Sequence, residues 1–229
     1  MLYEAIRKAS DIFHKEEKRA WCYDSYMRDK NWDMWQDTEA LNTSEIARLV
    51  TFLKQWYMQF YPSSSEAQLC LLNAIRATAP YMKLLKGETL LTIDFQRELM
   101  PGITASQAIN KVFEIIAKAQ GRQDMTASSK ICHTIAPDLF VMFDGPIRSG
   151  YAILLMEDYG QRFLPRMQKL ARKAVAEYVS RYKSAEFEAL QFLCSGCGHT
   201  LPKVLDEYNY VKFTLRNDEI WDVEFQVLE

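Results

Sequence analysis

Apolar residues recur every three or four positions along most of this chain, which is the spacing of one face of an α-helix. Longer connections are few, so most of the chain is expected to be helical. The predicted helices cover residues 2–19, the stretch from Asn42 to Pro62, the stretch from Ser63 to Pro80, the stretch from Thr104 to Gly121, a short run after Thr126, a run from Asp144 towards Gly160, and residues 161–183, 184–193 and 201–214.

Helix-start signals precede several of these apolar stripes. Asn42 stands three residues before Glu45, and Thr104 three residues before Gln107, which is the spacing of a capping box. Asp144 ends the apolar run 139–143 and is expected to cap the next helix by accepting its free amides.

We therefore predict an all-α protein of about nine or ten helices. We expect one compact helical domain over residues 1–229, with a division into two lobes, 36–157 and 1–35 plus 158–229, as an alternative. The tail alternates apolar and polar residues over 220–227, which predicts a short C-terminal β-hairpin with 211–215. The low counts of Gly (8) and Pro (7) agree with a mainly helical chain.

Composition narrows the function classes. A hydrophobic fraction of 48% with 25% charged residues is ordinary for a soluble globular protein, and no apolar run approaches the roughly 20 residues that span a bilayer. Five cysteines without a regular framework suit a reducing compartment, so we expect a cytoplasmic protein without a membrane partner.

The net charge of −2 does not indicate nucleic-acid binding, so binding would need a local basic patch. Residues 162–183 offer one, with seven Lys or Arg against one acid. The stripe that could contact phosphates consists of Arg162, Arg166, Lys169 and Lys173.

The segment from Trp21 to Trp35 is rich in aromatic residues and has no clean period. We expect a short helix or an ordered loop there. Its rings either pack against the next helix or form a platform on which bases stack.

Candidate chemistry concentrates in residues 126–150. If Thr126 caps its helix, Lys130 lies in the second turn among apolar neighbours, which lowers a lysine pKa and frees the amine as a nucleophile towards a carbonyl or a sugar C1′. The alternative is a surface lysine that extends past those neighbours.

Three further residues belong to this stretch. Asp144 can cap a helix and also act as a base or stabilise a developing cation. His133 is a candidate acid–base residue on the same helix face as Lys130, or else a core histidine. Arg148 could pair with Asp144 or with a phosphate.

Cys194, Cys197 and His199 have the spacing of half a zinc site, and the sequence offers no second pair of ligands nearby. A complete zinc site would also need Cys132, His133 or an acidic residue as a further ligand. We expect free thiols, with no metal and no cofactor.

The order Ser129-Lys130, His133, Pro137, Phe140 and Asp144 resembles a pattern in bacterial proteins related to 8-oxoguanine DNA glycosylases, and is more distantly similar to the helix-hairpin-helix glycosylase superfamily. The resemblance covers about 25 residues. The superfamily has a glycine-rich hairpin, and the corresponding run of this chain, 121–127, has only one glycine.

The resemblance implies a DNA base-excision glycosylase, with lyase activity, that acts on a flipped-out nucleotide in double-stranded DNA. Lys130 would attack C1′ and Asp144 would assist the sugar cation. The alternative function is a catalytically inactive helical interaction or defence-associated protein, in which the two residues form a helix cap and a local ion pair.

Overall fold

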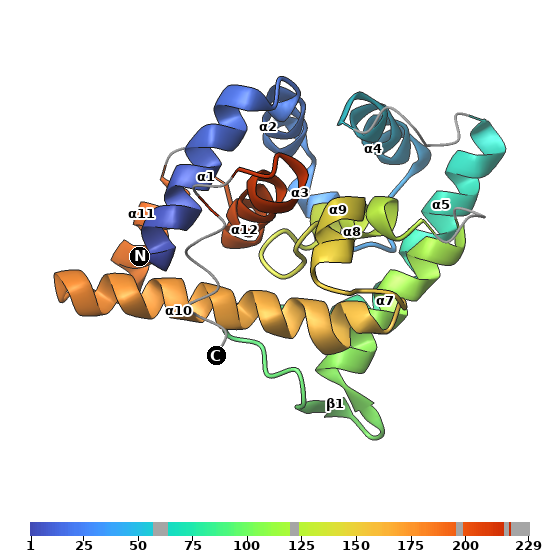
Figure 1. The fold of residues 1–229 in the computed structure, drawn as a ribbon. Coiled ribbons are helices and arrows are strands. Elements are labelled where there is room, and N and C mark those ends of the chain that lie inside the picture. Colours follow the sequence, from blue (N-terminus) through green and yellow to red (C-terminus); the bar gives the residue numbers. More distant parts are fainter. Residues whose placement is uncertain (57–63, 120–123, 196–198, 218–219, 221–229) are drawn as a thin grey trace.

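A computed structural model describes residues 1–56, 64–119, 124–195, 199–217 and 220, and these residues form a mainly helical protein, as predicted (Figure 1). No helix among them is both long and apolar enough to cross a membrane. The α-helices are α1 (Leu2–Glu16), α2 (Ala20–Asp29), α3 (Trp32–Gln36), α4 (Thr43–Trp56), α5 (Ser65–Ala77), α6 (Ala79–Leu84), α7 (Ala105–Ala119), α8 (Met125–Ile135), α9 (Gly145–Gly150), α10 (Leu164–Tyr182), α11 (Glu186–Cys194) and α12 (Leu201–Asn209). Two π-helical turns, η1 (Tyr159–Phe163) and η2 (Tyr210–Thr214), complete the helical elements.

The helices pack in two groups that share one continuous apolar core. In one group α1 packs on α10, α11, α12 and η2; in the other α5 and α6 pack on α7, which also contacts α8. The long helix α10 runs beneath both groups in Figure 1, and η1 joins it to α7. The proposed boundary between two lobes stays a prediction.

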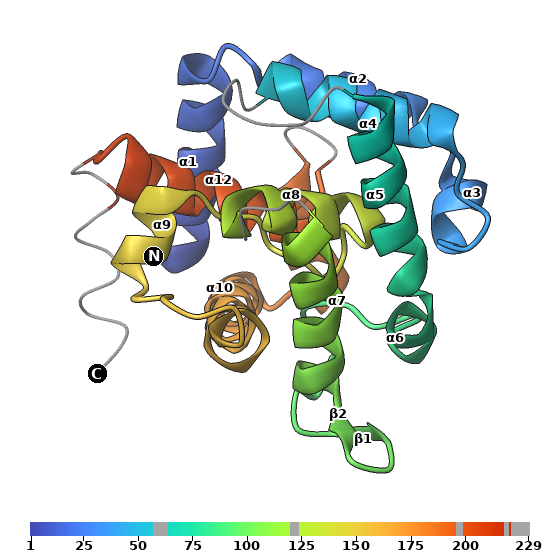
Figure 2. The ribbon, with the colours of Figure 1, turned by 90° about the vertical axis from the view of Figure 1, so that its right-hand side faces the viewer.

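Helix α8 crosses the middle of the molecule, as Figure 2 shows. All eleven of its residues are buried, which is the pattern of a helix surrounded by protein on every side. Its N-cap is Asp124, whose carboxylate accepts a 3.0 Å hydrogen bond from the amide of Ala127. The prediction that Thr126 caps this helix was therefore wrong, because the chain already turns helical at Met125.

Two further predicted caps are present, although the Glu45 carboxylate bonds Trp35 and Arg48 instead of closing a capping box with Asn42. Asn42 accepts from the Glu45 amide at 3.1 Å. Thr104 and Gln107 form a reciprocal capping box, since each amide donates to the other side chain. Three separate helix starts in the sequence, these two and that of Asp144 described below, thus follow from local side-chain hydrogen bonds.

The described sheet is not at the C-terminus. Strands β1 (Glu98–Met100) and β2 (Ile103–Thr104) pair antiparallel around Pro101 and Gly102, where Gly102 takes a positive φ of 77°. Residues 210–214 form η2, so the predicted strand 211–215 was wrong; this segment continues α12 and packs on α9 and α1. Most of its predicted partner, 220–227, lies outside the described residues.

The helix predicted from Asp144 to Gly160 is much shorter. Helix α9 ends at Gly150, and Ala152 takes a left-handed φ of 53° that a helix cannot contain. The carboxylate of Asp158 accepts hydrogen bonds from the amides of Leu154 and Leu155 at 3.0 Å, which stabilises the turn. The basic helix predicted over 161–183 begins as η1 and becomes α10 at Leu164.

Gly160 allows η1 to lie directly against α7. Its amide donates to Asn110 Oδ1 and its carbonyl accepts from Ser106 Oγ, each at 2.8 Å. A Cβ added at Gly160 would stand 2.8 Å from the backbone carbonyl oxygen of Ser106, too close for any side chain. Glycine is required there by the close approach of two backbones.

We predict that Gly160→Ala lowers the free energy of unfolding by about 1–3 kcal/mol, because η1 must move away from α7. Urea denaturation measures the change. Gly145→Ala is the matched control, since nothing lies within 4 Å of the added Cβ, and it should change stability by less than about 0.5 kcal/mol. Equal effects of the two substitutions would contradict this account of the contact.

Candidate functional site

A buried cluster of charged side chains lies where α12 packs on α1. Lys203, Asp206 and Glu207 follow one face of α12, and Lys203 and Glu207 are completely buried. The ammonium of Lys203 lies 2.9 Å from Asp206 Oδ2 and 3.4 Å from Glu207 Oε1. The spacing of three and four residues thus brings one cation between two anions.

These charges remain ionised because they compensate one another. Burial alone would lower the pKa of Lys203, but the carboxylates of Asp206 and Glu207 outweigh it and raise that pKa. Burial opposes ionisation of Glu207 too, yet Lys203, His14 and His199 hold its pKa well below the usual range. Lys203 and Glu207 are therefore a charged pair at neutral pH, whereas burial raises the pKa of Asp206.

Aromatic rings enclose the ammonium of Lys203. The ring centroid of Phe13 lies 4.3 Å from Nζ, that of Trp56 lies 4.9 Å away and that of Tyr23 lies 5.2 Å away. A cation over aromatic faces is stabilised by their quadrupoles, most strongly where water is excluded. Helices α1, α2 and α4 each supply one of these rings, so the cation joins three helices to α12.

Two histidines and a serine complete the polar cluster. His199 Nδ1 lies 2.7 Å from Glu207 Oε1, and its Nε2 lies 2.5 Å from Asp24 Oδ1 on α2. His14 Nε2 on α1 lies 3.5 Å from the same Glu207 oxygen. Ser10 donates a 2.6 Å hydrogen bond to Glu207 Oε2. Glu207 is thus the carboxylate on which this cluster converges.

Lys130 lies in the second turn of α8, as predicted, and is buried rather than extended into solvent. Burial lowers the pKa of Lys130 to about 8, against the opposing fields of Asp206 and Asp144. Its ammonium lies 6.0 Å from the ring centroid of Trp56, which also contacts Lys203. Lys130 therefore borders the charged cluster on α12.

The structure also explains why Asp144 returns towards Lys130. Ser129, the neighbour of Lys130, accepts a 3.2 Å hydrogen bond from the amide of Phe143. This bond holds the extended run before Asp144 against α8. Asp144 then caps α9 by accepting from the Ile147 amide at 2.9 Å, and its second oxygen accepts from Thr214 Oγ1 at 2.6 Å.

His133 has the position and the partners of a core histidine. It is fully buried, and burial lowers its pKa to about 3, so the ring is neutral. Its Nδ1 donates to the carbonyl of Phe140 at 2.7 Å, which leaves Nε2 to accept from the hydroxyl of Tyr23 at 2.7 Å. These bonds join α8 to α2; a role of His133 in proton transfer stays a prediction.

The predicted basic residues are spread over three elements, α9, η1 and α10. Arg162 forms an ion pair with Asp158 at 3.2 Å, and Arg166 stacks over the Tyr151 ring at 4.6 Å. Lys169 is exposed, and Lys173 is half-buried and lines a cavity beside Met1. Arg148 on α9 lies 6.0 Å from the ring of Phe143, the residue before Asp144. Arg148 follows Asp144 by four residues in the sequence.

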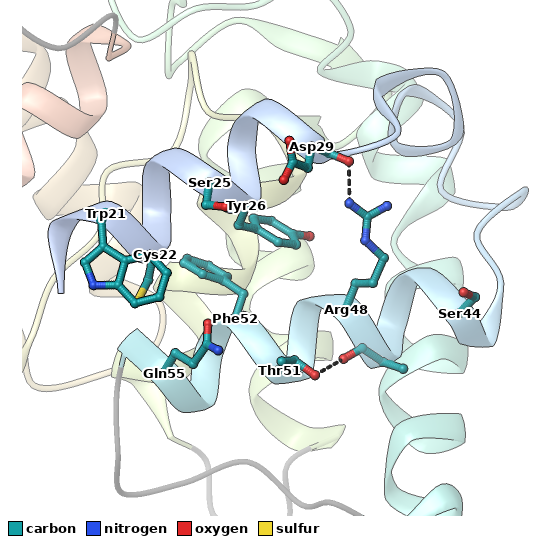
Figure 3. Close-up of a pocket in the computed structure, with 11 residues that line it drawn as sticks. Trp21, Cys22, Ser25, Tyr26, Asp29, Ser44, Arg48, Thr51, Phe52 and Gln55 are labelled. Atoms are coloured by element: carbon teal, nitrogen blue, oxygen red, sulfur yellow. Dashed lines mark hydrogen bonds between the residues drawn. The ribbon is translucent and has the colours of Figure 1, made fainter.

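The aromatic segment 21–35 contributes to a groove between α2 and α4 with a volume of about 380 Å³. Figure 3 shows the rings of Tyr26 and Phe52 side by side between the two helices, where they stack with centroids 4.4 Å apart. Trp21, at one end of the groove, is 62% exposed. The prediction that this segment packs against the next helix is confirmed for Tyr26, whereas base stacking on Trp21 stays a prediction.

The cysteine half-site is described in part. Cys194 lines one cavity together with His199, and Cys197 lies outside the described residues. The sequence pattern did not predict Lys203, Asp206, Glu207 or His14 as site residues. The spacing of a lysine and two acids on one helix face was visible, but nothing in the sequence indicated that this face is buried.

Comparisons of this chain with protein-family models, with curated proteins and with solved structures give no match. The geometry above is therefore the basis for the function proposed below.

We predict that Lys203→Met lowers the free energy of unfolding by about 3–5 kcal/mol, because it leaves two buried carboxylates without their cation. Chemical denaturation measures this loss. The matched control is Lys83→Met, which removes an exposed ion pair with Glu39 and should cost about 0–1 kcal/mol. A loss below about 1 kcal/mol in Lys203→Met would show that the cluster does not stabilise the fold.

Proposed function

We propose that this protein is a base-excision glycosylase with lyase activity that acts on double-stranded DNA. The observation that carries the proposal is a buried lysine, Lys130, whose pKa is lowered to about 8 and which lies within the fields of Asp144 and Asp206. A lysine of that pKa is partly neutral at physiological pH, and the neutral amine is the nucleophile.

The proposed reaction begins with attack of the neutral Lys130 amine on C1′ of a flipped-out nucleotide. As the nitrogen–C1′ bond forms, the glycosidic bond breaks, and its electron pair leaves with the base, which then takes up a proton. Asp144 stabilises the positive charge that develops on the sugar and accepts a proton from the attacking nitrogen. The nitrogen lone pair then forms a double bond to C1′ as the C1′–O4′ bond breaks, and O4′ leaves with the electron pair and takes back the proton held by Asp144. The product is an iminium that joins Lys130 to the DNA.

Access to the lysine sets a requirement on the protein. Lys130 is 8% exposed, so a nucleotide reaches it only when the residues that cover it move. Trp56, at the end of α4, is one neighbour that borders both Lys130 and Lys203. The basic residues proposed to contact the DNA backbone are Arg148, Arg162, Arg166, Lys169 and Lys173.

A cytosolic setting suits this proposal. Among the described residues, Cys22, Cys70 and Cys132 are free thiols, which a reducing compartment maintains.

A second candidate, a non-catalytic helical interaction protein, is supported by the hydrogen bonds of Asp144. One of its oxygens caps α9 and the other accepts from Thr214, so the carboxylate already has a structural role. Under this alternative, Asp144→Ala costs about 0.5–2 kcal/mol of stability and changes no activity.

Borohydride trapping tests the proposed enzyme. Duplexes that contain 8-oxoguanine, uracil or an abasic site are incubated with the protein and borohydride, which reduces the iminium to a stable amine. We predict a covalent adduct with at least one duplex, and peptide mass spectrometry should locate the attached sugar on Lys130. The reaction should speed up as the pH rises through about 8, because a growing fraction of Lys130 is then neutral.

Two variants serve as controls. Lys130→Gln should form no adduct, whereas Lys30→Gln should form it normally, although Lys30 is also buried and has a pKa lowered to about 7. Asp144→Asn retains an excellent helix cap and should slow adduct formation by roughly 10²–10⁴-fold. The absence of an adduct on every duplex, or an undiminished adduct in Lys130→Gln, would exclude the enzyme and favour the interaction protein.

A further inference from the structure

Three potential metal-ligand atoms converge beside the charged cluster. They are Nε2 of His14 on α1, Nδ1 of His199 just before α12, and Oε1 of Glu207 on α12, and all three lie within 4.8 Å of one another. The Glu207 oxygen is 3.5 Å from the His14 nitrogen and 2.7 Å from the His199 nitrogen. Two imidazoles and a carboxylate form a ligand set found in catalytic zinc sites.

The two carboxylate contacts of His199 need a positive charge at this place, which either a doubly protonated ring or a bound metal ion supplies. Both ring nitrogens face carboxylate oxygens, Nδ1 towards Glu207 and Nε2 towards Asp24. A neutral imidazole carries one N–H, so it can donate to one of these carboxylates but not to both. A metal ion on Nδ1 would satisfy this side of the ring, while the proton on Nε2 is donated to Asp24.

The surrounding groups orient the three ligands. Asp24 accepts from the far nitrogen of His199, which is the carboxylate–histidine arrangement that accompanies metal-bound histidines. Ser10 donates to Glu207 Oε2 at 2.6 Å, so the other oxygen of that carboxylate is turned towards the histidines. Two of the three ligands therefore have a second partner that fixes their direction.

Distance and charge both suit a divalent ion. Bonds of about 2.0–2.1 Å in a tetrahedral zinc site separate the ligand atoms by about 3.3 Å. The 3.5 Å separation of His14 Nε2 from Glu207 Oε1 already matches this value. The 2.7 Å separation of His199 Nδ1 from the same oxygen would widen by about 0.6 Å when zinc binds. The Glu207 carboxylate faces the ion directly, and the Asp24 carboxylate lies behind His199, so acidic groups stand on two sides of the site.

We propose that His14, His199 and Glu207 bind one divalent transition-metal ion, of which zinc is the best match, and leave a fourth position for water. The side chain of His14 is 29% exposed, so the ion enters from the α1 side. Lys203 keeps its bond to Asp206 when the metal takes the Glu207 oxygen. This site is independent of the glycosylase proposal, since none of its ligands takes part in the attack on C1′.

Isothermal titration calorimetry with zinc chloride tests the site, on full-length protein first stripped with a chelator. We expect one zinc ion per chain and no heat of binding with magnesium chloride, because magnesium prefers oxygen ligands. Asp24→Asn should weaken zinc binding by roughly 10–100-fold, and His14→Ala should weaken it more than that. Circular dichroism would establish that both variants are folded.

Cys194→Ser is the matched control, because Cys194 lines a cavity with His199 and belongs to the competing half-site with Cys197. We expect this variant to bind zinc as tightly as the wild type. The cobalt-substituted wild-type protein should show the visible bands of a nitrogen and oxygen site without a thiolate-to-cobalt charge-transfer band. This spectrum does not depend on any variant folding.

Three results would each overturn the proposal. The first is no zinc binding to the wild type. The second is loss of zinc binding in Cys194→Ser together with retention in His14→Ala, which would locate the ion at the cysteines. The third is a thiolate charge-transfer band in the cobalt protein.

Discussion

The ammonium of Lys203 lies inside the protein between Asp206 and Glu207, and the rest of the structure depends on how this charge is neutralised. A lone buried cation would be far too costly, so both carboxylates must remain beside it. The aromatic rings that enclose the cation come from α1, α2 and α4. One ion cluster on a short helix thus fixes how four helices meet.

The same cluster sets the chemistry of its neighbours. Burial lowers the pKa of Lys130, and the negative charge of Asp206 makes that decrease smaller. Glu207 orients His14 and His199, so the proposed metal site shares a carboxylate with the ion pair. The candidate nucleophile and the candidate metal ligands are therefore two sides of one electrostatic unit. A change in one charge is expected to shift the proton affinity of the others.

Local patterns predicted the helices well, because a cap such as Thr104 with Gln107 involves residues three apart. Thr126 was the wrong cap for α8, because Asp124, two residues earlier, belongs to a residue type that caps helices equally well. The strand predicted over 211–215 is a π-helical turn because packing on α1 and α9 overrides its local alternation. Lys130 and Asp144 were identified from their neighbours, but the cluster was missed because partners such as Ser10 and Glu207 are 197 residues apart.

A direct titration of Lys130 tests most sharply whether the buried cluster controls the candidate nucleophile. Lysine side chains labelled with ¹³C are followed by NMR as the pH rises, and Lys130→Gln assigns the signal. The account predicts a midpoint near pH 8 in the wild type and a lower one in Asp206→Asn, because that carboxylate favours the protonated lysine. A midpoint near the ordinary value of 10.5 in both proteins would contradict it.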